Sequence, residues 1–250
     1  MRFSDREAVH AIRARLEPLG RTGLSIVYTE KGNSKSARKA AGFWLDSEMY
    51  DHAAFAEDTS NLFKREAAIY EALSSHPCIL KCIGVELMHD EEEAWALYLE
   101  RAPHKYLREY IGKNEPPTMA RRLQVAVDFT EALQYVHDRG VIWGHVSPRS
   151  VIVFDDLHIK LCDFAGSTLK GSVLEKELFV LGTTICEITE WTVPYGSTEI
   201  EELQQKLTDG EYPHVGDNNP VKDAVKKLWR FAYSSAQELA EALRAALIGT

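Results

Sequence analysis

The predicted secondary structure changes in kind at about Glu100, and this order restricts the fold more than any other feature of the sequence. Before Glu100 the chain carries short strand-like apolar runs, among them LSIVYTE (24–30) and AGFWLD (41–46). After it, apolar residues recur three or four positions apart, as in an amphipathic helix, most regularly over residues 119–140. A strand-rich part followed by a mostly helical part predicts an α+β fold in which two lobes share a cleft.

Two helices and a turn are also predicted within the strand-rich part. Apolar residues at helical spacing predict a first helix over residues 4–19; they are Val9, Ile12, Leu16 and Leu19. A second helix is expected from about Thr59 and must end before Pro77, which cannot continue a helix. Between the first two strand-like runs, the polar segment KGNSKSARK (31–39) is expected to form a turn.

The composition is that of an ordinary globular chain, with 45% apolar and 27% charged residues over 250 positions. The formal net charge of −9 argues against nucleic acid or an anionic membrane as a partner, because both select basic surfaces. The first residues lack the apolar core of a signal peptide, and no stretch approaches the about 18 apolar residues of a membrane span. We therefore expect a cytoplasmic protein without a membrane span, with a nuclear location left open.

Five motifs occur in the order typical of protein kinases. FKREAAIYEAL followed by HPCILKCIG resembles the regulatory helix and the next strand, and LYLERAPHKYLREYI resembles the hinge with its flanking strand and helix. ALQYVHDRGVIWGHVSPRSVIV resembles the catalytic loop, IKLCDFAGS the metal-binding segment, and ELFVLGTTICEITEWTVPYG the buried helix beneath them. The DFAGS and SPRS segments are most similar to a kinase-like branch abundant in filamentous fungi. The resemblance covers residues 60–250.

This resemblance implies a bilobal protein-kinase-like fold. The small lobe is expected to be strand-rich with one regulatory helix, and the larger lobe helical. We expect a helical extension at residues 1–22, the small lobe at residues 23–100 and the large lobe at residues 101–250.

The catalytic loop departs from the kinase pattern where the chemistry needs it most. In H-R-D-x-x-x-x-N, the aspartate orients the substrate hydroxyl and accepts its proton. The matching histidine, arginine and aspartate positions here are Trp143, Gly144 and His145. A protonated His145 would bring positive charge to a site that must release a proton, so a histidine packed or hydrogen-bonded in a vacated loop is the plainer interpretation. Ser147 replaces the lysine that neutralises the transferring phosphate, and Ser150 replaces the asparagine that reaches magnesium. These degenerate positions predict no catalytic residues.

Four residues form a candidate residual nucleotide site. Asp163 survives at the metal-binding position and carries the carboxylate that magnesium prefers. A turn aspartate bonded to nearby backbone amides explains the same residue equally well. Glu66 stands at the glutamate position of the regulatory helix, and Glu100 and Ala102 lie at the hinge. We expect no cofactor, or at most weakly bound ATP and magnesium, with Asp163 as the metal ligand.

The lysine that should pair with Glu66 has no obvious counterpart. No lysine or arginine occurs between Lys39 and Lys64, and the span expected to hold that lysine places Asp46 or Ser47 near its position. Lys39 lies 27 residues before Glu66, which is too far upstream unless a loop intervenes. Without a cation, Glu66 would repel nucleotide phosphates.

The glycine-rich loop that cradles phosphates is missing as well. Gly20, Gly23 and Gly32 never form G-x-G-x-x-G, so no run of free backbone amides is expected to bind phosphate. Together with the missing lysine, this predicts weak nucleotide binding or none.

The activation segment is shortened. Only 14 positions separate Asp163 from Glu177, which stands where the buried helix of a kinase carries its anchoring aspartate. Kinases have a segment roughly two to three times as long there. The A-P-E motif is absent, and its usual arginine partner has no clear equivalent, Arg230 being the nearest. A peptide substrate would have no platform.

The sequence therefore predicts a pseudokinase that acts by binding, scaffolding or regulating protein partners, with surfaces such as the helical extension as candidate docking sites. A nucleotide-binding switch using Asp163 and the hinge is an alternative, as is an atypical serine/threonine phosphotransferase using His145. A purely structural domain of a larger assembly is a fourth interpretation. The identity of the partner and the oligomeric state do not follow from the sequence.

Overall fold

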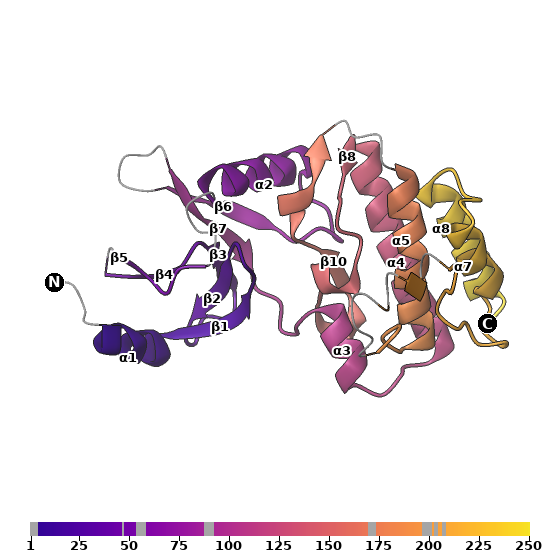
Figure 1. The fold of residues 1–250 in the computed structure, drawn as a ribbon, viewed down its shortest axis with the longest axis horizontal. Helices are drawn as coiled ribbons and strands as arrows, with labels where there is room; N and C mark the ends of the chain where they lie inside the picture. The colour runs from indigo at the N-terminus through magenta and orange to yellow at the C-terminus, as the bar shows by residue number, and fades with distance from the viewer. Residues whose placement is uncertain are drawn as a thin grey trace. The chain divides into compact units, whose positions relative to one another are not determined.

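The structure is a computed structural model of the chain, divided into two compact units (Figure 1). The first unit comprises Met1–His76 and Leu80–Pro103, and the second comprises Pro77–Ile79 and His104–Thr250. The first is rich in strands and the second in helices, as the sequence predicts. The residues described are 5–46, 48–53, 59–87, 93–169, 174–196, 202, 205–206 and 209–250.

The first unit is built on a five-stranded antiparallel sheet with strand order β1-β2-β3-β7-β6. Helix α2 (Thr59–Leu73) packs on β6 and β7, and α1 (Asp5–Arg15) leads into β1 (Figure 1). A separate hairpin of β4 (Phe43–Leu45) and β5 (Glu48–Tyr50) follows β3. The sheet strands are β1 (Leu16–Arg21), β2 (Ile26–Glu30), β3 (Ser36–Ala40), β6 (Cys82–Leu87) and β7 (Ala94–Glu100).

Helix α2 turns one face to the sheet. Phe63, Ile69 and Leu73 are buried on this face, and Glu66 is buried with them. The helix begins at Thr59, as predicted. Its apolar stripe needs a partner surface, and the neighbouring strands supply one. The predicted packing of this helix on the strands that follow it is confirmed.

The first helix is shorter than the sequence predicts. Helix α1 ends at Arg15 and the next residues form β1, so the expectation of a helix up to residue 19 is wrong. Pro18 explains the change, because proline has no N–H for a helical hydrogen bond and holds the residue before it in extended backbone. Strand β1 lies at the edge of the sheet, where a proline is tolerated. Leu16 is therefore buried in the core of a sheet rather than on a helix.

Strand β3 lies largely inside the segment 31–39, for which the sequence predicts a turn. The turn itself is brief: the side-chain oxygen of Asn33 accepts hydrogen bonds from the amides of Lys35 at 2.9 Å and Ser36 at 3.2 Å. Strand β3 then pairs with β2 on one side and β7 on the other. Its sequence, Ser-Ala-Arg-Lys-Ala, has little intrinsic preference for a strand, so pairing on both sides determines its structure.

Helix α4 (Met119–Asp138) lies at the centre of the second unit's contacts. It packs on α5 (Leu174–Glu190), α8 (Ala236–Ile248), β8 (Val141–Ile142) and β10 (Ile159–Leu161). The hydroxyl of Thr118 caps its start by accepting from the amide of Arg121 at 3.3 Å. Its end is followed by Gly140 at φ +70°, the left-handed position that favours glycine. The predicted span of this helix is confirmed to within two residues.

Short hairpins and turns connect the helices of the second unit. Strand β9 (Val151–Val153) pairs with β10, and β11 (Thr168–Leu169) pairs with β8. The β9–β10 hairpin contains the apolar runs of SVIVFDD (150–156) and HIKLCDF (158–164). The remaining described elements are α3 (Leu107–Lys113), α7 (Lys222–Trp229), η2 (Pro148–Ser150), η3 (Asp155–Leu157) and η4 (Phe164–Gly166).

Candidate functional site

The glutamate of the regulatory helix has a lysine partner. The Nζ atom of Lys39, in β3, lies 3.0 Å from Oε1 and 2.8 Å from Oε2 of Glu66, in α2. The Lys39 side chain is 10% exposed and the Glu66 side chain 1%. Removing either charge would take the ion-pair partner from the other in a buried site, which is unfavourable. The expectation that Glu66 lacks a cation is wrong, and Lys39 is that cation.

The β4–β5 hairpin explains why distance along the chain misleads here. It lies between Lys39 and Glu66 and forms its own two-stranded sheet, so it lengthens the connection without separating the two side chains. Asp46, expected near the lysine position, lies at the hairpin turn with φ +47° and forms an ion pair with Arg15 at 3.0 Å. Ser47, the other residue expected there, lies outside the described residues.

The turn between β1 and β2 hydrogen-bonds to itself. The amide of Thr22 donates to the carbonyl of Ser25 at 2.8 Å. The Thr22 hydroxyl accepts from the amides of Leu24 at 3.2 Å and Ser25 at 3.0 Å. In a phosphate-binding loop, such amides point at the ligand. Here they are bonded within the turn, which agrees with the missing glycine-rich motif.

The two hinge residues lie at the end of strand β7 and just after it. The amide of Glu100 donates to the carbonyl of Lys81 at 2.9 Å, and its carboxylate accepts from the amide of Lys81 at 2.6 Å. Ala102 follows and is half-buried. Glu100 therefore ties the end of β7 to the chain just before β6.

The first position of the catalytic-loop pattern is a core residue. Trp143 is fully buried, and its indole N–H donates to the carbonyl of Cys162 at 3.1 Å. Its ring lies between those of Phe129 and Phe164, with centroids 6.0 and 5.9 Å away. Trp143 therefore fixes the loop to the core of the second unit.

Glu177 anchors the next position of the loop. Its Oε1 accepts a hydrogen bond from the amide of Gly144, and its Oε2 lies 2.7 Å from Nε2 of His137. Gly144 has φ +78°, and a Cβ there would lie 2.7 Å from the carbonyl oxygen of Gly166. A glycine is therefore required, and the anchoring role expected of Glu177 is confirmed.

His145 and Asp163 face each other. Nδ1 of His145 lies 4.0 Å from Oδ2 of Asp163, and the two side chains are 62% and 36% exposed. The imidazole is thus not packed into the loop, contrary to the plainer interpretation of the sequence. Asp163 adopts left-handed backbone, at φ 60° and ψ 63°, and its side chain does not cap η4. The structure brings these two predicted site residues together.

The two serines of the loop hold its backbone. The hydroxyl of Ser147 accepts from the amide of Arg149 at 3.2 Å, which caps η2. Ser150 is buried, and its carbonyl accepts from the amide of Cys162 at 2.9 Å. Both residues therefore have local structural roles at positions where a kinase uses lysine and asparagine.

A third serine, which the sequence reasoning missed, also supports the loop. The hydroxyl of Ser167 donates to the carbonyl of Trp143 at 2.7 Å, and Ser167 is fully buried. Its one signal in the sequence is its place at the end of the DFAGS segment. Residues 170–173 of the shortened activation segment lie outside the described residues.

A buried ion pair joins α3 to α5. Nε of Arg108 lies 2.8 Å from Oε1 of Glu187, whose side chain is fully buried. Burial raises the pKa of Glu187, and the Arg108 guanidinium partly offsets this rise. No local pattern relates residues 79 positions apart, so sequence reasoning did not find the pair. Arg230, the nearest candidate for the arginine of the A-P-E pair, is exposed and forms no ion pair with any described residue.

Comparison with known families agrees with the fold. Residues 48–177, more than half of the chain, match the protein tyrosine and serine/threonine kinase family. The chain therefore belongs to this family. Its strand-rich first unit and helical second unit are the two lobes of the kinase-like α+β fold, as the sequence predicts.

Individual relatives are similar at low identity. They include a probable serine/threonine-protein kinase of Dictyostelium discoideum, 21% identical over 76% of this chain and 34% of that protein. A serine/threonine-protein kinase of Arabidopsis thaliana is 28% identical over 56% of this chain and 17% of that protein. A probable serine/threonine-protein kinase of Clostridium perfringens is 24% identical over 85% of this chain and 31% of that protein. The chain thus spans about a third or less of each. None of these three comes from a filamentous fungus, so similarity to the fungal branch stays a prediction.

The described residues contain neither a membrane-spanning helix nor a cluster of metal-binding side chains. No helix among them is long and apolar enough to cross a membrane. No group of three or more His, Cys, Asp or Glu side chains in those same ranges is placed to hold a metal ion.

Proposed function

We propose that this chain is a kinase homologue that has lost phosphate transfer and acts by binding a protein partner. The observation that carries the proposal is the imidazole of His145 at the position of the catalytic aspartate. A carboxylate there would orient a substrate hydroxyl and take up its proton. The imidazole is exposed, faces Asp163 and has no hydrogen bond to any described residue. It therefore provides neither a fixed orientation nor a negative charge.

The phosphate-binding side of the first unit supports the same conclusion. Its β1–β2 turn bonds the amides that would otherwise contact phosphate. The cation Lys39 is present, but a single lysine lacks the backbone donors that fix phosphates in place. Weak nucleotide binding follows from these contacts.

Two observations favour a second candidate, a nucleotide-binding switch. The Lys39–Glu66 pair is intact, and Asp163 lies half-buried beside the exposed His145. Some relatives at low identity are named probable serine/threonine-protein kinases. A low-activity phosphotransferase is therefore an alternative function for this chain. A measurement of binding and one of transfer separate these functions.

Thermal unfolding with and without nucleotide tests the proposal. A ligand at a hundredfold excess over its dissociation constant raises the stability of the folded state by about 2.7 kcal/mol. We expect little or no shift of the melting temperature with millimolar ATP and magnesium. A clear magnesium-dependent shift that Asp163→Ala abolishes, and that the exposed control Asp156→Ala retains, would replace the proposal with the nucleotide switch.

A further inference from the structure

The second unit contains a pocket with a basic wall. Its volume is about 410 Å³, and Lys222, Lys226 and Arg230 line it. These residues lie four positions apart, so they project from one face of α7 and its end. His214 lines the same pocket. On a chain of net charge −9, this is a local concentration of positive charge.

Aromatic rings form another part of the same pocket. Tyr212 and Trp229 both line it and stack with centroids 5.0 Å apart and planes within 11°. The indole N–H of Trp229 donates to the Thr183 hydroxyl at 3.2 Å, which fixes that ring. Phe179 packs on Tyr212 and on Phe231, whose side chain is 59% exposed. The pocket therefore continues into an exposed aromatic surface.

Two of the three cations lack an acidic partner among the described residues. Nζ of Lys222 lies 2.5 Å from Asp217, and this contact lowers the pKa of Asp217. Neither Lys226 nor Arg230 has a carboxylate within ion-pair distance in the part of the chain that the structure describes. Asp217 also attracts Lys226, but without close contact. A partner carboxylate would therefore meet two cations without a close ion pair in a concave site, where ion pairs are stronger than on a flat surface.

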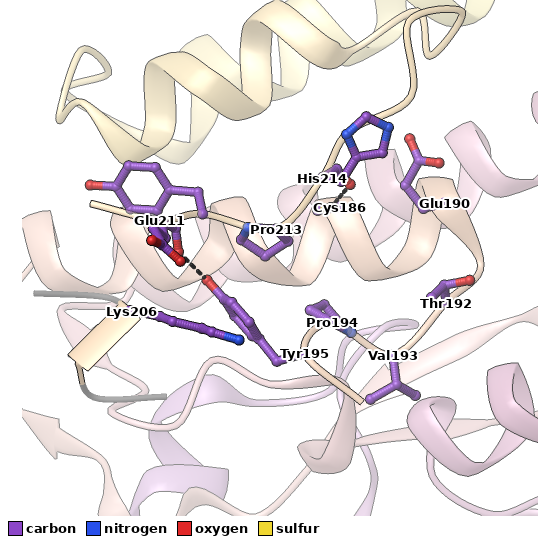
Figure 2. Close-up of a pocket in the computed structure, with 11 residues that line it drawn as sticks. Cys186, Glu190, Thr192, Val193, Pro194, Tyr195, Lys206, Glu211, Pro213 and His214 are labelled. Atoms are coloured by element: carbon purple, nitrogen blue, oxygen red, sulfur yellow. Dashed lines mark hydrogen bonds between the residues drawn. The ribbon is translucent and has the colours of Figure 1, made fainter. Parts of the chain in front are cut away.

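A neighbouring pocket differs in this respect. It has a volume of about 490 Å³ and shares Tyr212, Pro213 and His214 with the basic pocket. Figure 2 shows its lining residues, two pairs of which are joined by hydrogen bonds, Tyr195 to Glu211 and Cys186 to His214. Glu190 accepts from the amides of Gly216 and Asn219, and the Tyr195 hydroxyl donates to the carbonyl of Glu211 at 3.0 Å. Its lysine, Lys206, pairs with Glu202 at 2.7 Å. Cations without a close ion pair to any described residue are thus a property of the basic pocket.

We propose that the basic pocket binds an acidic peptide segment of a partner protein. Carboxylates of the peptide pair with Lys226 and Arg230, and an apolar side chain lies on the exposed ring of Tyr212, which the buried Trp229 supports from behind. A guanidinium binds a carboxylate through two parallel hydrogen bonds, and arginine and aromatic residues are enriched at protein interfaces. The inference rests on the proposed binding role and names its partner class, but it does not depend on the loss of catalysis.

Fluorescence anisotropy with the full chain tests this site. The probe is a short fluorescein-labelled peptide that alternates glutamate with phenylalanine. Each charge-assisted hydrogen bond contributes about 1.5 kcal/mol, or roughly tenfold in affinity. We therefore expect the double variant Lys226→Glu/Arg230→Glu to bind at least about tenfold more weakly. Lys227→Glu is the matched control, because Lys227 is exposed on the same helix and does not line the pocket.

The outcomes separate this site from general charge attraction. Weakening confined to the double variant, with both variants melting like the unaltered chain, supports the proposal. Equal weakening by Lys227→Glu, or equally tight binding of a single-stranded oligonucleotide of the same charge, overturns it. Absence of binding to the unaltered chain at millimolar peptide also overturns it. Each of these results leaves the loss of phosphate transfer untouched, because the probe reports only on the second unit.

Discussion

The two units retain different parts of the kinase machinery. The first keeps the lysine and glutamate that handle nucleotide phosphates, but its β1–β2 turn uses its own amides. The second keeps a firmly held catalytic loop and Asp163, but has His145 in place of the catalytic aspartate. Lys39 and Glu66 are buried and join β3 to α2, so they also stabilise the fold. The exposed side chain at position 145 has no such role. The kinase-like residues of the first unit thus also support its structure, whereas the side chain at position 145 does not.

The largest loss of stability is expected in the first unit. Glu66→Ala leaves the buried ammonium of Lys39 without its carboxylate, which lowers the free energy of unfolding by about 3 kcal/mol. Urea denaturation measures this change. The double variant Lys39→Met/Glu66→Leu should recover most of it, because a pair of apolar residues leaves no uncompensated charge. A loss below about 1 kcal/mol in Glu66→Ala would show that the pair does not stabilise the unit.

A smaller effect is expected in the second unit. Glu177→Ala removes the acceptor for the amide of Gly144 and the partner of His137, at a cost of about 2 kcal/mol. The matched control is Glu175→Ala, an exposed position in the same helix, which should change stability by less than about 0.5 kcal/mol. Equal destabilisation by both variants in urea would mean that the loop does not depend on Glu177.

Repair of the catalytic loop is expected to produce no phosphate transfer. The triple variant His145→Asp/Ser147→Lys/Ser150→Asn restores the base, the phosphate cation and a magnesium ligand. The parts of this machinery act as a unit, with non-additive effects. The self-bonded β1–β2 turn and the shortened activation segment remain, so radiolabelled ATP should label neither generic substrates nor the chain.

The control for that experiment is the same triple variant with Asp163→Ala, which defines the background. Labelling above this background would contradict the comparison between the units. It would mean that Lys39 and Glu66 suffice on the phosphate side, and that the defect lies in the second unit alone.

The sequence predicted the second unit better than the first, for physical reasons. Helix α4 has long apolar periodicity, a capping threonine and a terminal glycine, and each is a local signal. Strand β3 has none, because its small and charged residues form a strand only when paired on both sides. Missing β3 also meant missing Lys39. In the first helix, the spacing of Leu16 and Leu19 outweighed Pro18, although the proline is the stronger signal.

The site itself was predicted where motifs are contiguous and missed where contacts are remote. His145, Asp163 and Glu177 follow from neighbouring residues in known order, and the structure brings them together around one loop. The Arg108–Glu187 pair and the bond from Ser167 to Trp143 depend on how separate elements pack. No local pattern encodes such contacts, so they required the structure.

The β4–β5 hairpin has a consequence for how such chains diverge. The entropy of closing a loop grows only logarithmically with its length, so doubling a connection costs only about 0.6 kcal/mol. A hairpin that bonds to itself adds still less, because its own residues are ordered by their pairing. The connection from β3 to α2 can therefore be long without separating the two side chains that it joins. The interval between two functional residues in the sequence is thus a poor guide to whether they meet.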